Sequence, residues 1–319
     1  MDRKISSKLI SDFIAAGKRP RNQIATLSGL TNTYIRNLEK GEIENVPKNR
    51  IIALGVALNL DLTEIDELLF AFDRSQLTDL DIPVFIETAK KAKLSEAVLP
   101  VRDLSAYELI ILSMEQFPGR QVIVNDRPTA SLMVEGHRSH TDRRILSCHP
   151  IYKNLIEAIG AARRDNFHRL ISEHLIDHYI CKSCLEDYLK NEPDIVERAF
   201  RYRHVAEILN IVRSYDNFRL FLTDACHNLS FTIKFSDKSG VNDKLSYSSR
   251  APHALTRGKR GRLIGFLTEN LTLCECFKEE LLQVDKTKNE TLAVKEHQED
   301  YLCRLLAPIA AELGEHFEN

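Results

Sequence analysis

Four side chains of the kind that bind soft metals recur along one short stretch: His174, His178, Cys181 and Cys184. On a continuous helix, offsets of four, three and three residues keep these side chains on one side. Imidazoles and thiolates are zinc ligands, and Cys-x-x-Cys is a spacing used in metal and redox sites. A single straight helix cannot surround a metal, so zinc or another metal here requires a bend near Tyr179 or further ligands from elsewhere. The alternative is a buried helix face on which cysteine acts as a small apolar residue.

Two clusters of basic residues form a second group that could bind a ligand. Guanidinium and ammonium groups bind phosphate or carboxylate, and neighbouring glycines would let a backbone approach such a ligand. The clusters therefore predict a pocket for an anionic effector, or an extension of a DNA footprint, or a solvated run of charge. The residues proposed for an effector are Arg138, Arg143, Arg144, Arg257, Lys259 and Arg260.

The motifs of common enzyme classes are absent from the sequence. It contains no G-x-S-x-G, no Walker loop, no G-x-G-x-x-G and no H-E-x-x-H. We therefore expect the protein not to be an enzyme.

A third group of polar residues lies in 21–41, which predicts two short helices joined at Ser28-Gly29. Gly29 suits the positive φ of a sharp helix-to-helix turn, and Thr31 or Asn32 suits a helix cap. Ile35 and Leu38 would face inward, which leaves hydrogen-bonding groups outside on a helix that fits the major groove of DNA. The alternative is an ordinary helical hairpin with a polar outer face.

The stretch from Gln23 to Leu62 resembles the helix-turn-helix of the Cro/C1-type (XRE) repressors. The residues that carry the resemblance are Ile24-Ala25, Gly29-Leu30, Ile35, Leu38-Glu39-Lys40-Gly41, Pro47, Ile52, Leu54, Leu58 and Leu60. The resemblance implies a DNA-binding domain whose second motif helix enters the major groove. It implies groove-facing roles for Thr31, Asn32, Thr33, Tyr34, Arg36 and Asn37, and phosphate contacts at Arg21, Asn22 and Gln23.

The 319-residue chain has 43% hydrophobic and 28% charged residues, which is typical of a globular protein. The net charge is −2, but residues 1–50 carry ten Lys or Arg and five Asp or Glu, a net charge of +5. No apolar run reaches the length of a membrane span, and the first residues lack the apolar core of a signal peptide. We therefore expect a cytoplasmic protein without a membrane segment, and we expect its seven cysteines to be reduced thiols.

Hydrophobic periodicity divides the chain into three parts. Residues 1–72 predict an all-α domain of five helices, and residues 73–100 predict a helical connector. Residues 101–319 mix helical and strand patterns, which predicts a larger α/β or α+β domain for sensing or dimerisation. In this part we expect helices throughout 151–190 and a pair of strands at 218–224 and 229–236.

These observations predict a sequence-specific transcriptional regulator that binds a double-stranded DNA operator as a homodimer. Two copies are expected because one short helix reads too few base pairs for useful specificity. Two alternatives remain open at this point: an enzyme acting on nucleic acid or nucleotides with an attached DNA-binding module, and a phage-type repressor or antitoxin without a small-molecule effector.

Overall fold

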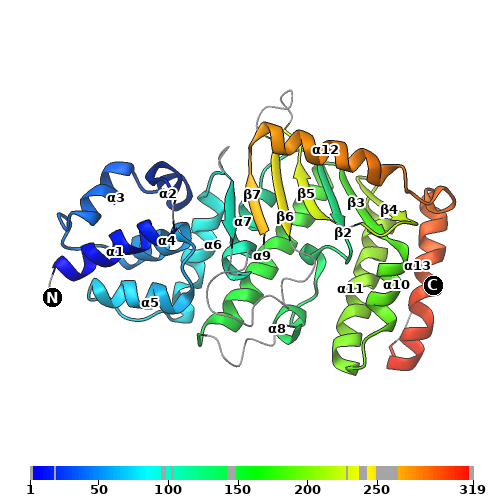
Figure 1. Cartoon of the computed structure of the whole chain (residues 1–319). Coiled ribbons are helices and arrows are strands. Elements are labelled where there is room, and N and C mark those ends of the chain that lie inside the picture. Colours follow the sequence, from blue (N-terminus) through cyan, green and yellow to red (C-terminus); the bar gives the residue numbers. More distant parts are fainter. Residues whose placement is uncertain are drawn as a thin grey trace.

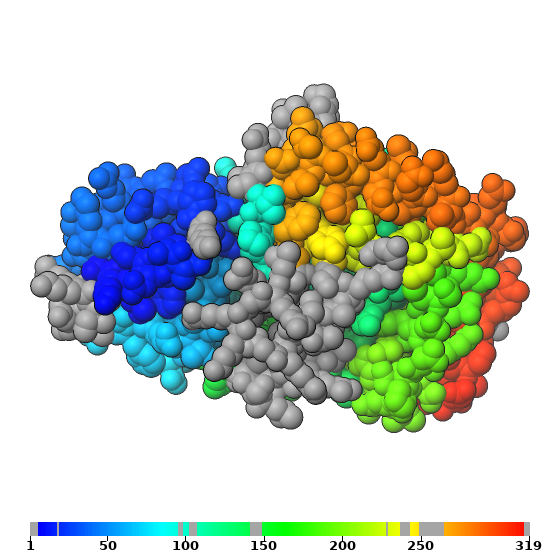
Figure 2. Space-filling model, in the orientation of Figure 1, coloured from blue at the N-terminus to red at the C-terminus, as the bar shows by residue number. Residues whose placement is uncertain are grey.

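The computed structural model describes residues 3–17, 19–94, 98–101, 104–141, 149–227, 229–236, 243–248 and 265–315. The chain forms an elongated molecule with the first helices at one end and the last helix at the other (Figure 1). The space-filling view shows the same order, with the blue N-terminal helices forming one end (Figure 2).

The N-terminal part consists of helices only. They are α1 (Arg3–Gly17), α2 (Arg21–Ser28), α3 (Asn32–Glu39), α4 (Lys48–Leu58) and α5 (Leu62–Ala71). Helix α4 is the central element, because every residue from Ile51 to Leu58 is buried. Helix α5 starts with a capping box in which Asp61 accepts from the amide of Glu64 and Glu64 accepts from the amide of Asp61. The all-α expectation for this part is confirmed.

The connector joins the two parts through packing as well as through the chain. It contains η1 (Asp79–Asp81) and α6 (Ile82–Lys91), and it is followed by the short strand β1 (Leu99–Val101). One continuous cluster of buried apolar side chains runs from the N-terminal helices through Phe85 and Ala89 of α6 to Leu112 and Ile156. The first helices are therefore packed onto the rest of the protein rather than tethered to it.

A mixed seven-stranded sheet forms the centre of the larger part. Besides β1, its strands are β2 (Gln121–Asn125), β3 (Ile176–Cys181), β4 (Phe218–Thr223), β5 (Ser230–Lys234), β6 (Lys244–Ser248) and β7 (Gly265–Thr268). The strand order is β1-β7-β6-β5-β2-β3-β4. Strands β2, β3 and β4 are parallel, and all other neighbours are antiparallel. The carboxyl ends of the three parallel strands therefore meet at one edge.

Helices cover both faces of this sheet (Figure 1). One face carries α12 (Leu271–Asp285), whose Cys274 and Val284 pack with Val122, Phe231 and Ile233 of the strands. The other face carries the remaining helices: α7 (Leu104–Glu115), α8 (His137–Thr141), α9 (Tyr152–Glu173), α10 (Lys182–Lys190), α11 (Ile195–Ser214) and α13 (Lys295–Leu313). Two short 3₁₀ turns complete the described elements, η2 (Ala130–Leu132) and η5 (Glu290–Leu292).

The expected helices and strands of the larger part are present, with two corrections. Residues 151–190 are not helical throughout, because Ile176–Cys181 forms the buried strand β3. All six side chains are buried although the segment contains Asp177 and His178, so the sequence lacked the apolar run that is typical of a central strand. Strands β4 and β5 do not pair with each other, because β4 pairs with β3 and β5 pairs with β2.

Candidate DNA-binding surface and buried cavity

The α2–α3 pair has the local geometry expected of residues 21–41. Gly29 ends α2 with a φ of 69°, in the left-handed region that favours glycine. Thr31 caps α3, and its hydroxyl accepts a hydrogen bond from the Tyr34 amide at 3.1 Å. Ile35 and Leu38 are buried, so they fix which side of α3 faces outward.

The outward side of α3 is a polar edge made of Thr31, Asn32, Thr33 and Arg36, all of them exposed. Within the described residues, the side chains of Asn32, Thr33 and Arg36 make no hydrogen bond or ion pair. We call these four residues the α3 edge. It offers hydroxyl, amide and guanidinium groups at the end of the molecule farthest from α13 (Figure 1).

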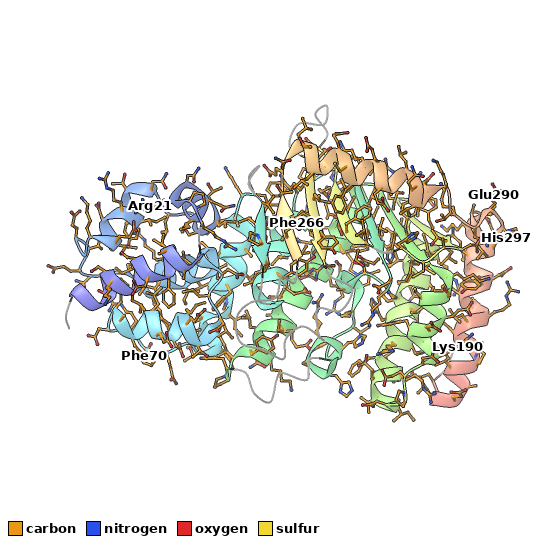
Figure 3. All side chains as sticks on the ribbon, viewed as in Figure 1. Arg21, Phe70, Lys190, Phe266, Glu290 and His297 are labelled. Atoms are coloured by element: carbon orange, nitrogen blue, oxygen red, sulfur yellow. The ribbon has the colours of Figure 1, made fainter. Side chains whose placement is uncertain are left out.

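Three other residues predicted to contact DNA are held by the protein itself. Arg21 makes two hydrogen bonds to Glu39, at 2.5 Å and 3.0 Å, and so ties α2 to the end of α3. Figure 3 labels Arg21 on the surface of these helices. Asn37 donates to Glu42 and to the Thr33 carbonyl, both at 3.2 Å. Asn22 is exposed, and its side chain accepts from the amide of the next residue at 2.9 Å.

Gln23 and Tyr34 do not lie where the family resemblance implies. Gln23 is only 6% exposed, because its side chain lies on the buried side of α2, which faces the core of the N-terminal helices. Tyr34 is half-buried, and the guanidinium of Arg50 lies 4.7 Å from the centre of its ring. Of the nine residues predicted to contact DNA, Gln23 is buried, Tyr34 and Asn37 are half-buried, and the other six are exposed.

A cavity of about 200 Å³ lies in the larger part, between the sheet and the helices α7, α8 and α9. Its floor is unusually polar for a sheet face covered by helices. Ile123, Thr232 and Ser246 are in register on neighbouring strands, as are Ser230 and Ser248, and all five line the cavity. Side chains in register project to the same side, so this run of hydroxyl groups faces the cavity.

The opposite wall holds a buried cluster of two carboxylates and two guanidinium groups. Arg163 bonds Glu115 at 2.5 Å and 2.9 Å and also bonds Glu108. Arg138 bonds Glu108 at 2.6 Å, and Ser131 donates to Glu115 at 2.6 Å. Burial opposes the ionisation of Glu108, but Arg138 and Arg163 outweigh burial and hold its pKa at about 2.

Gly160 of α9 leaves space for the side chain of Arg138, one of the two arginines of this cluster. A Cβ atom at Gly160 would lie 2.6 Å from Cδ of Arg138, which is too close for any real contact. Arg138 therefore crosses α9 at this glycine and reaches both Glu108 and the Ala130 carbonyl, the latter at 2.5 Å.

The residues that end and follow β2 also line the cavity. Asn125 ends the strand, and Asp126 and Arg127 come next. Within the described residues, the side chains of Asp126 and Arg127 form no ion pair or hydrogen bond. Nearby, Glu197 accepts from Arg201 at 2.9 Å and lies 3.3 Å from His137. Burial opposes its ionisation, but these two partners hold the pKa of Glu197 below its usual value.

Among the described residues of the lining, acids and arginines are equal in number. The acids are Glu108, Glu115, Asp126 and Glu197, and the arginines are Arg127, Arg138, Arg163 and Arg201. Four buried polar atoms in the lining lack a hydrogen-bond partner within the described part of the chain: Gln121 Oε1, Arg138 Nε, Glu197 Oε2 and Ser230 Oγ. Buried polar groups without partners are rare, so water or another bound molecule would satisfy these atoms.

The residues predicted for an anionic effector are only partly described. Arg138 lines the cavity, but it is engaged by Glu108. Arg143, Arg144, Arg257, Lys259 and Arg260 lie outside the described residues. The sequence reading missed Glu108 and Glu115, although two acids seven residues apart in an otherwise apolar helix share one face and indicate buried ion partners.

The predicted set of four metal ligands does not assemble. His174 follows the end of α9, and His178 lies inside β3, where burial lowers its pKa to about 4. Cys181 ends the same strand, three residues on, so it faces the opposite side from His178. The structure instead brings Cys181 and Cys184 together with Cys226.

Comparisons of the chain with family models, with curated proteins and with solved structures gave no match. None of the described helices has the length and apolar character needed to cross a membrane.

Proposed function

We propose that the protein is a sequence-specific DNA-binding transcriptional regulator that acts as a homodimer, with α3 in the major groove. The single observation that carries the proposal is the α3 edge. Its side chains are exposed, with Asn32, Thr33 and Arg36 unengaged within the described residues, while the buried side of the same helix is fixed by Ile35 and Leu38. Amide and guanidinium groups in this arrangement are suited to reading base edges.

The charge distribution along the chain also supports DNA binding by the N-terminal helices. Residues 1–50 carry a net charge of +5 in a chain whose net charge is −2. Attraction to phosphate would therefore orient this end toward DNA.

The cavity is the proposed effector site of this regulator. Helices α7 and α9 form its wall and share a buried cluster with α6 and with the N-terminal helices. Polar links reinforce the same junction: His149 lies 2.8 Å from Asp66, and Arg19 donates to the Pro100 carbonyl at 3.1 Å. A ligand that moves α7 or α9 would therefore shift the α3 edge relative to that of a second copy.

The described part of the lining favours an uncharged or zwitterionic polar molecule over a strongly anionic one. Each described arginine of the lining except Arg127 is already bonded to a carboxylate. The hydroxyl-rich floor and the unpartnered polar atoms would instead bind groups that both donate and accept. A dry engineered cavity of about 150 Å³ holds benzene, so a cavity of about 200 Å³ suits a ligand somewhat larger than one ring.

Selection from random duplexes by the intact protein tests the proposal. We expect enrichment of an inverted repeat whose half-sites are about 10 base pairs apart, centre to centre. On the selected duplex, Arg36→Ala should weaken binding about 5- to 150-fold, which corresponds to about 1–3 kcal/mol for a lost base contact.

The matched control is Arg304→Ala, which removes an exposed arginine from α13 at the other end of the molecule. This variant should bind the selected duplex like the unchanged protein. No enriched sequence, or equal losses in the two variants, would contradict the proposal.

A further inference from the structure

Three thiols from separate segments converge at the edge where the parallel strands end. Cys181 is the last residue of β3, Cys184 lies in the first turn of α10, and Cys226 follows β4. Their sulfur atoms all lie within 4.8 Å of one another, and those of Cys184 and Cys226 are 3.3 Å apart.

We propose that Cys181, Cys184 and Cys226 form a binding site for a tetrahedral divalent metal ion, namely zinc. A Zn–S distance of about 2.3 Å places the sulfurs of a tetrahedral site about 3.8 Å apart. The 3.3 Å between the sulfurs of Cys184 and Cys226, and the limit of 4.8 Å on all three pairs, lie close enough to this value that small changes in side-chain torsion would bring all three onto one ion. Thiolate sets of this kind select zinc over harder cations such as magnesium and calcium.

The fold brings the three ligands together through its backbone. Strands β3 and β4 are parallel neighbours, and Cys181 pairs in register with Thr223 of β4. Cys226 follows three residues after Thr223, which places it beside the end of β3. Helix α10 starts at Lys182, directly after Cys181, and the positive end of a helix dipole favours the thiolate form of a nearby cysteine.

Packing does not account for these cysteines. Cys181 is buried, but Cys226 is exposed and Cys184 is partly exposed, whereas a cysteine that serves as a small apolar residue is buried, so packing leaves two of the three thiols unexplained. A disulfide between Cys184 and Cys226 would use two of the three thiols and would leave out Cys181, whose sulfur lies beside them. A metal ion uses all three.

The fourth ligand comes from His227 or from solvent. His227 follows Cys226 directly, and its Nε2 lies 2.9 Å from the Thr223 hydroxyl. Histidines that bind metals through one ring nitrogen commonly hold a second hydrogen bond through the other, and Thr223 fits that role.

A metal at this site would fix one wall of the cavity. It would join α10 to the segment after β4, and Tyr188 of the same helix lines the cavity on the other side of β3. The site goes beyond the proposed function, because its test requires neither DNA binding nor an effector.

The test is metal analysis of the full-length protein purified without chelator. We expect one zinc ion per chain, loss of that zinc in Cys226→Ser, and full retention in the control Cys303→Ser. Cys303 is a partly buried thiol of α13 that Arg213 contacts at 3.2 Å, outside the cluster.

Reconstitution covers the case in which zinc is lost during purification. Protein stripped of metal and reduced should take up one Co²⁺ with the absorption of tetrahedral thiolate coordination, and Cys226→Ser should lack that spectrum. A shifted cobalt spectrum in His227→Ala would assign the fourth ligand to His227, and an unchanged spectrum would assign it to solvent. Absence of both zinc and the cobalt spectrum would overturn the proposal. So would full metal content in Cys226→Ser, or a Cys184–Cys226 disulfide that persists under reducing conditions.

Discussion

Replacing Arg163 by methionine should destabilise the protein strongly, because this guanidinium neutralises two buried carboxylates. Arg163 bonds both Glu108 and Glu115, and all three side chains are less than 10% exposed. In the variant, Glu108 keeps Arg138 as a partner, but Glu115 keeps only the hydroxyl of Ser131. One carboxylate is then left buried without a positive partner.

The expected cost follows from that single uncompensated charge. Removing one partner of a buried ion pair lowers the free energy of unfolding by about 3–5 kcal/mol. This is a large share of the roughly 5–15 kcal/mol by which domains are stable. The double variant Arg163→Met/Glu115→Gln should recover part of the loss, because it removes the stranded charge.

The pH dependence gives a second check on the same variant. A buried carboxylate without a partner has a pKa above its unfolded value, so the protein holds the proton that the unfolded chain releases. The penalty in Arg163→Met should therefore be greatest at neutral pH and should decrease toward pH 5.

Urea unfolding followed by far-UV circular dichroism measures these differences, with Arg164→Met as control. Arg164 is the next residue of α9, and it donates one hydrogen bond, to the Met133 carbonyl at 2.8 Å. Its loss should cost about 1 kcal/mol. Equal costs for the two variants at pH 7, or no recovery in the double variant, would refute the argument.

Three further predictions concern stability. Burial lowers the pKa of His178 to about 4 and of His204 to about 3, so both stay neutral in the folded protein. In the unfolded chain both histidines become protonated below about pH 6.5. The free energy of unfolding should therefore decrease as the pH is lowered, by up to about 2.7 kcal/mol per pH unit for the two groups together. A flat profile from pH 6.5 to 4.5 would contradict this. Asp61→Ala removes the side-chain cap of α5 and should cost about 1 kcal/mol in urea unfolding; an unchanged midpoint would count against the cap. Gly160→Ala should lower the melting temperature although alanine favours helix, because the new methyl group displaces Arg138; a rise would show that Arg138 can move aside.

Local patterns predicted the N-terminal helices well, because their determinants are close in sequence. Gly29 supplies a positive φ, Thr31 caps the next helix, and the buried spacing of Ile35 and Leu38 orients it. What the sequence could not predict was which polar residues of this segment would be engaged internally. Gln23 is buried and Arg21 is held by Glu39, and both contacts depend on how neighbouring helices cross.

The larger part was harder to predict, because its important contacts join distant residues. The strand at Ile176–Cys181 is too short to be told from a helix by periodicity, and its Asp177 and His178 hide the apolar pattern that a buried strand would show. The ion cluster joins α7, α8 and α9, and the thiol cluster joins Cys181 and Cys184 to a residue 42 positions further on. Sequence spacing grouped Cys181 and Cys184 with His174 and His178, whereas the fold brings them together with Cys226, because β3 interrupts the helical stretch that this spacing implied.

The most direct test of the DNA-binding account is dimethyl sulfate footprinting on the selected duplex, since this reagent reads both grooves. It methylates guanine N7 in the major groove and adenine N3 in the minor groove. The account predicts protection of guanine N7 in two half-sites about one helical turn apart, with that protection lost in Arg36→Ala. Protection confined to adenine N3, or guanine protection that persists in Arg36→Ala, would contradict the assignment of α3 to the major groove.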